Sequence, residues 1–207
     1  MRFLVVLLCV IYAFGMEANI ENVNKNIVTL NKPVTKGVSG VVLCPYEGKE
    51  IICARAVSLG KKAELKIYDN LKNDAFALPV VSPKKGDKII FGKNYDRILI
   101  IAPNQEEYLK VKNRYKNATV ISSDNFAAVI DDIPTKKDFV NFAKKLDIGR
   151  IVFVLDKIYE VDAYSFYAVK KYGNVSAKYN KIFFTTYPDF DLQQKKIISY
   201  YKKLIKE

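Results

Sequence analysis

The pattern of apolar and polar positions is most regular between residues 131 and 163. From Phe139 to Leu146, apolar residues recur at helical spacing and lysines take the opposite side, which predicts an amphipathic helix. Thr135 precedes this helix and Asp138 follows three residues later, a spacing typical of a capping box.

An unbroken apolar run follows the predicted helix, from Ile151 to Leu155. A strand without alternation is typical of a sheet that is covered on both faces. After a turn at Asp156 and Lys157, apolar and polar residues alternate over 158–163, which predicts a half-exposed strand. Together these segments indicate an α/β unit with a parallel-type buried strand.

The chain from Asn24 to Gly92 has a sequence pattern typical of strands and turns. Its short alternating segments are separated by turns rich in glycine, asparagine and proline, which favours a small antiparallel barrel or sandwich. The candidate strands are 27–30, 38–44, 51–59, 63–68, 76–81 and 88–91. Pro79 lies inside one of them and predicts an edge strand there, because proline cannot donate to the ladder.

Strand-like and helix-like segments alternate from Asn94 onward, which predicts an α/β domain with a partly parallel sheet. The predicted strands are 97–102, 118–121 and 181–186, and the predicted helices are 104–115, 125–130 and 189–206. Residues 165–172 fit either a helical turn or a continued strand. We therefore expect an all-β module over residues 24–93, followed by an α/β module over 94–207 that ends in an amphipathic helix.

The first residues form a separate segment. Arg2 precedes a nearly unbroken apolar run from Phe3 to Phe14, and small residues near Ala13 stand at the spacing that a signal peptidase reads. The run is too short to span a bilayer comfortably. We predict that residues 1–15 are a secretory signal peptide. The mature chain is then exported to the periplasm or the bacterial cell surface, with no transmembrane segment.

The chain is strongly basic, with a formal net charge of +12 at pH 7. For an exported protein, this charge favours anionic lipid head groups, cell-wall polymers or acidic protein surfaces as neighbours, rather than nucleic acid. A surface that is merely kept soluble by its lysines explains the same charge, because the lysines are spread along the chain. A peripheral contact with an anionic envelope surface therefore stays open.

Two cysteines, Cys44 and Cys53, follow the predicted signal peptide. A hairpin centred on Gly48 and Lys49 places them directly opposite each other, within disulfide reach. A register shift of one residue separates them. Export makes the bond chemically possible, and the sequence leaves it open.

The residues carry no signature of catalysis. The chain has no histidine, which excludes Ser-His-Asp and Cys-His catalysis and zinc-hydrolase sites. Two carboxylate pairs, Asp131 with Asp132 and Glu160 with Asp162, have the groups for acid–base or cation chemistry, but solvated carboxylates are the simpler interpretation. We expect a protein that is not an enzyme and that holds no cofactor or metal.

One region is dense in aromatic residues, and sheet packing is the favoured interpretation of it over a face that binds sugars or a protein partner. Its members are Tyr159, Tyr164, Phe166, Tyr167 and Tyr172.

Four stretches resemble a known family in their amino-acid sequence and in their order along the chain. They are KGVSGVVL at 36–43, PKKGDKIIFGKNYDRILIIAPNQEEYL at 83–109, SSDNFAAVIDDIPTKKDF at 122–139 and RIVFVLDKIYEVDAYSF at 150–166. The chain resembles the plasminogen-binding protein N-terminal domain family of exported proteins from epsilon-class proteobacteria, over nearly the whole mature length. The resemblance implies cell-surface capture of host plasminogen, whose kringle domains bind lysine.

Such capture is usually attributed to a C-terminal lysine, whereas this chain ends in Lys206 and Glu207. A substitute is available on the predicted last helix, where Lys203 and Glu207 stand one turn apart. The candidate partner-binding residues are therefore Lys202, Lys203, Lys206 and Glu207. A frayed, solvated helix end is the simpler interpretation of the same residues.

An alternative function is that of a periplasmic structural or adaptor protein, with an envelope protein as its partner. The second half of the chain is similar to the small α/β modules of periplasmic assembly proteins in its order of helix, strand and hairpin. This similarity concerns the fold alone.

Overall fold

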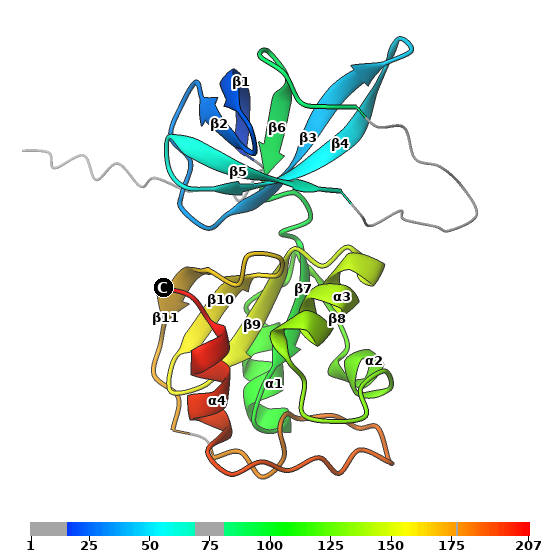
Figure 1. Cartoon of the computed structure of the whole chain (residues 1–207). Coiled ribbons are helices and arrows are strands. Elements are labelled where there is room, and N and C mark those ends of the chain that lie inside the picture. The colour runs from blue at the N-terminus through cyan, green and yellow to red at the C-terminus, as the bar shows by residue number, and fades with distance from the viewer. Residues whose placement is uncertain (1–15, 69–80, 177) are drawn as a thin grey trace, which may run out of the picture.

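The computed structural model describes residues 16–68, 81–176 and 178–207 (Figure 1). It shows a β module stacked on an α/β module, with the chain passing once between them near residue 94 (Figure 1). The predicted signal peptide at 1–15 lies outside the described residues, as does most of the predicted strand 76–81 with Pro79.

Six antiparallel strands close into a barrel in the order β1-β2-β5-β4-β3-β6. They are β1 (Met16–Asn24), β2 (Ile27–Leu30), β3 (Ser39–Tyr46), β4 (Lys49–Ser58), β5 (Lys62–Ile67) and β6 (Lys88–Phe91). Pairing of β1 with β6 closes the barrel and so removes the exposed edges of an open sheet. The predicted small antiparallel module is confirmed, and it is a barrel.

The barrel begins before the predicted start of the β module at residue 24. In β1, Ala18 and Ile20 point into the barrel core and are 2% exposed, while their neighbours face solvent. Only two buried apolar side chains are a weak signal for a nine-residue strand, and the strand forms because β2 and β6 supply ladder partners on both sides.

The β3–β4 hairpin turns at Glu47 and Gly48, one position before the predicted turn, so the strand pairing is shifted by two residues from the predicted register. Cys44 stands opposite Ile51, and a bulge in the ladder leaves Cys53 without a directly paired residue on β3. The structure nevertheless joins Cys44 to Cys53 by a disulfide, with Cα atoms 5.8 Å apart.

The second module is built on a five-stranded sheet in the order β11-β10-β9-β7-β8. The strands are β7 (Arg97–Ile101), β8 (Thr119–Ile121), β9 (Arg150–Val154), β10 (Ile158–Asp162) and β11 (Ala168–Tyr172). Strand β7 is parallel to β8 and β9, whereas β10 is antiparallel to both of its neighbours. The partly parallel sheet is thus confirmed, and residues 165–172 contribute a strand.

Helices cover both faces of this sheet. They are α1 (Gln105–Lys112), α2 (Ser123–Ala127), α3 (Lys136–Leu146) and α4 (Ile197–Leu204). The predicted capping box is present at α3, where Thr135 and Asp138 satisfy each other's backbone N–H groups.

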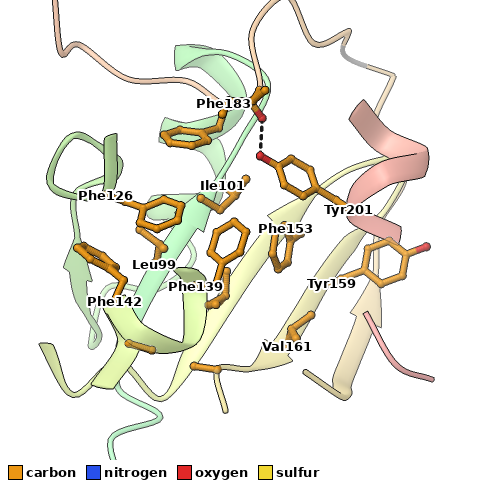
Figure 2. Close-up of a cluster of buried hydrophobic side chains, with 14 of the residues drawn as sticks. Leu99, Ile101, Phe126, Phe139, Phe142, Phe153, Tyr159, Val161, Phe183 and Tyr201 are labelled. Carbon is orange, nitrogen blue, oxygen red and sulfur yellow. Dashed lines mark hydrogen bonds between the residues drawn. The ribbon is translucent and has the colours of Figure 1, made fainter. Parts of the chain in front are cut away.

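One face of the sheet packs against α2, α3 and α4. Figure 2 shows Leu99, Ile101 and Phe153 of the sheet beneath aromatic rings from these helices. Tyr201 of α4 is fully buried there, and its hydroxyl donates to the carbonyl oxygen of Ile182 at 2.9 Å (Figure 2). The alternate residues of β7 and β9 face α1, which explains why both strands are apolar throughout.

Two predictions for the last third of the chain are wrong. Residues 181–186 form no strand, although Ile182 and Phe183 are fully buried. The last helix begins at Ile197 and not at Asp189, because Phe190 turns into the core and packs on Phe183 with ring centroids 4.8 Å apart.

Strand β10 is also not half-exposed as predicted. All five of its residues are buried, including Glu160 and Asp162 on the side expected to face water. The barrel lies over the Asp162 end of this strand and supplies hydrogen bonds from Ser39 to that carboxylate, whereas Glu160 pairs with Arg150 of β9.

Candidate functional site

The interface between the two modules is organised around Asp162, which is fully buried. Its Oδ2 accepts hydrogen bonds from the backbone N–H of Ser39 at 2.8 Å, from the Ser39 hydroxyl at 2.7 Å and from the Tyr95 hydroxyl at 2.8 Å. Its Oδ1 accepts from the backbone N–H groups of Tyr164 and Ser165. The hydrogen bonds of Asp162 therefore link the barrel, the linker and the sheet.

Glu160 belongs to a second buried group. Arg150 Nη1 donates to Glu160 Oε2 at 2.5 Å, and Arg150 Nε donates to the carbonyl oxygen of Tyr95 at 2.7 Å. Burial, together with the nearby charge of Asp162, raises the pKa of the Tyr95 hydroxyl far above its usual value, so the phenol stays protonated and donates. The sequence-predicted acid pair of Glu160 and Asp162 is thus held in hydrogen-bonded networks at the interface.

The backbone of the barrel touches the α/β module at Gly37. Ser165 Oγ donates to the Gly37 carbonyl oxygen at 2.5 Å. Gly37 has a φ of +86°, and an added Cβ would lie 2.2 Å from the Cβ of Tyr167. Glycine at this position therefore allows Tyr167 to pack directly on the barrel.

A small hollow of about 270 Å³ lies beside this contact, between the modules. Arg55 of β4 lines it, with its guanidinium carbon 3.5 Å from the ring centroid of Tyr164. This stacking of a barrel cation on an aromatic ring of the α/β module adds a third link across the interface.

The other predicted acid pair, Asp131 and Asp132, lies in an exposed loop before α3. Within the described ranges, no group of three or more potential ligands is placed to hold a metal ion.

The four predicted partner-binding residues lie at the C-terminal end but do not form one group. Lys202 pairs with Asp156 at 2.7 Å and Glu207 pairs with Lys171 at 3.0 Å. The predicted one-turn spacing of Lys203 and Glu207 is absent, because α4 ends at Leu204.

The chain end is also not a frayed helix. Lys206 donates its backbone N–H to the carbonyl oxygen of Phe166 at 2.7 Å, and its own carbonyl oxygen accepts from Ala168 at 2.9 Å. These bonds form a parallel bridge between Lys206 and Tyr167, which places the C-terminus beside β11 (Figure 1). Lys203 remains exposed on α4, and no ion pair within the described ranges involves it.

Lys206 belongs instead to a group of ammonium ions at the module interface. The ammonium groups of Lys36 and Lys206 lie 5.3 and 5.4 Å from the ring centroid of Tyr167, and that of Lys136 lies 5.1 Å from the Phe166 ring. We refer to Lys36, Lys136 and Lys206 as the lysine cluster. No local pattern predicts this cluster, because its members are separated along the chain by up to 170 positions.

The aromatic set mainly serves packing, as predicted. Tyr159 and Phe166 are buried in the core, and the hydroxyl groups of Tyr115 and Tyr172 lie within hydrogen-bond distance of each other at 2.9 Å. Tyr167 is the half-exposed member that the lysine cluster surrounds.

These features define a two-module protein in which the interface carboxylates Glu160 and Asp162 are hydrogen-bonded within the fold and lysine ammonium groups lie at the surface. The family described as "Plasminogen-binding protein pgbA N-terminal" matches residues 15–203, and the chain belongs to this family. No curated protein and no solved structure gives a significant match. None of the helices described is long and apolar enough to cross a membrane.

Proposed function

We propose that this chain is an exported, non-enzymatic protein that captures plasminogen at the bacterial surface. The observation that carries the proposal is the family match over residues 15–203, which includes both modules. Plasminogen takes up lysine through its kringle domains, so the ligand on this chain is an exposed ammonium group that no carboxylate of its own neutralises.

The C-terminal end offers two such groups with different surroundings. Lys203 lies on the exposed side of α4. The ammonium group of Lys206 lies near the Tyr167 ring, where the backbone of Lys206 forms a β-bridge with Tyr167. Lys202 is less suited, since its bond to Asp156 must break before a partner can take the ammonium group. We assign Lys203 and Lys206 as the lysines that plasminogen binds.

The test is surface plasmon resonance of the chain over residues 16–207 on immobilised plasminogen. Lys203→Gln and Lys206→Gln are each expected to weaken binding about fivefold or more, the effect of one lost charge contact of roughly 1 kcal/mol. Lys112→Gln is the matched control, because α1 covers the opposite face of the sheet from α4. Equal affinity for all three variants would contradict the assignment.

Capture of a host protein also requires exposure outside the cell. Protease treatment of intact bacteria is therefore expected to remove the chain. Protection in intact cells, with digestion after the outer membrane is permeabilised, would favour the alternative, a periplasmic structural or adaptor protein.

A further inference from the structure

The lysine cluster gathers positive charge where the two modules meet. Lys36 comes from the loop between β2 and β3, Lys136 is the first residue of α3, and Lys206 stands next to the end of the chain. Two of the three ammonium groups lie against the same Tyr167 ring. Lys136 Nζ also donates to the carbonyl oxygen of Ser165 at 3.2 Å, which holds it at the interface.

This charge is not neutralised by the part of the chain that the structure describes. No ion pair there involves Lys36, Lys136 or Lys206. The nearby carboxylate of Asp162 is fully buried, and its oxygens already accept five hydrogen bonds. Asp162 therefore cannot turn outward to pair with the cluster.

The repulsion within the cluster is visible at Lys136. Burial is the main cause that lowers the pKa of its ammonium group, and the positive charges of Lys206 and Lys66 lower it further. Cation–π contacts of Lys136 with Phe166 and of Lys206 with Tyr167 offset part of this repulsion. An anion bound between them would offset it.

We propose that the lysine cluster binds a phosphate group at the interface between the barrel and the α/β module. A phosphate monoester carries close to two negative charges at neutral pH and presents several acceptor oxygens, so it can accept hydrogen bonds from more than one ammonium group of the cluster. A single carboxylate would supply only one negative charge for the three ammonium groups. Lysine is also a common phosphate ligand that acts as a point charge from several directions.

The site draws ligands from both modules, so bound phosphate links them. Lys36 belongs to the barrel, whereas Lys136 and Lys206 belong to the α/β module. Because phosphate then binds the folded arrangement and not the unfolded chain, it raises the melting temperature. Gly37 and the Tyr167 side chain pack against each other at this contact, so the backbone amides of these two residues report on binding.

The test uses inorganic phosphate, titrated into the chain over residues 16–207 and followed by backbone-amide NMR. Sodium chloride at matched ionic strength is the reference. Saturable shifts are expected at Gly37, Lys136 and Tyr167. Lys206→Gln and Lys136→Gln are each expected to weaken the affinity about fivefold or more.

Lys157→Gln is the matched control, since Lys157 precedes β10 at the end opposite Asp162 and the interface. It is expected to bind phosphate like the unmodified chain. Melting curves identify any cluster variant that fails to fold. Lys36→Gln, at an exposed loop position, is then used in place of that variant.

A second arm distinguishes the source of the phosphate. Vesicles of phosphatidic acid in phosphatidylcholine are sedimented with the chain, with phosphatidylcholine alone as reference. Sedimentation that Lys206→Gln reduces assigns the site to a lipid head group, and phosphate binding without sedimentation assigns it to a soluble phosphate compound.

The proposal is overturned if phosphate gives no saturable shifts at the interface, or if the shifts persist unchanged in all cluster variants. Plasminogen takes no part in these measurements, so their result is independent of the proposed capture function.

Discussion

Replacement of Asp162 by asparagine tests how the two modules are held together. The change keeps the shape of the side chain but turns one acceptor oxygen into a donor. Oδ1 of Asp162 faces two backbone N–H groups, and Oδ2 faces the backbone N–H of Ser39 and two hydroxyl groups. The hydroxyl groups can rotate to accept a hydrogen bond, but the backbone N–H groups cannot.

The least costly orientation keeps the amide oxygen toward Tyr164 and Ser165. The amide NH₂ then faces the backbone N–H of Ser39, which is 4% exposed and loses its acceptor. A buried donor left without a partner costs about 1–3 kcal/mol, and the remaining bonds lose the strengthening that a charged acceptor gives. We expect Asp162→Asn to lower the free energy of unfolding by about 3 kcal/mol, the sum of the lost acceptor and the weaker remaining bonds.

The assay is urea unfolding of the chain over residues 16–207, followed by circular dichroism. Asp96→Asn is the matched control, because Asp96 lies in the same linker region with its side chain exposed. It is expected to change stability by less than about 0.5 kcal/mol. If Asp162→Asn were as mild as the control, the interface would not depend on this carboxylate.

Two further predictions concern the contact at Gly37 and the start of α3. Gly37→Ala is expected to lower the free energy of unfolding by about 3 kcal/mol, measured by thermal or urea unfolding, because the new Cβ would clash with Tyr167. Gly48→Ala is the control and should lower it by only about 1 kcal/mol, because Gly48 has a positive φ but open space around it. Equal losses of stability in the two variants would refute the clash. Hydrogen bonds from Thr135 hold the pKa of Asp138 below its usual value, so this contribution to stability is present above about pH 4 and is lost as the pH falls through the folded-state pKa. In an NMR titration, Thr135→Val should return that pKa toward its usual value, and an unchanged pKa would contradict the capping role.

Local pattern was sufficient to predict the elements whose own residues determine them. The capping box at Thr135, the apolar strand β9 and the alternating strand β5 all follow from spacing within a few residues. The change from a β module to an α/β module follows in the same way, because the period of the apolar positions changes along the chain.

Features that depend on distant contacts were not predictable in this way. Strand β1 exists because β2 and β6 flank it, and Asp162 is buried because the barrel covers it. Residues 189–196 carry a helical pattern, yet Phe190 gains more by packing on Phe183 than by continuing a helix. The lysine cluster likewise requires both modules to be in place before its members meet.

Lysine-dependent capture is tested directly by equilibrium binding of the chain over residues 16–207 to immobilised plasminogen at physiological salt, with and without a soluble lysine analogue. We predict saturable binding that the analogue abolishes. Binding that the analogue leaves unchanged would refute recognition through lysine, and the absence of binding would refute the capture function itself.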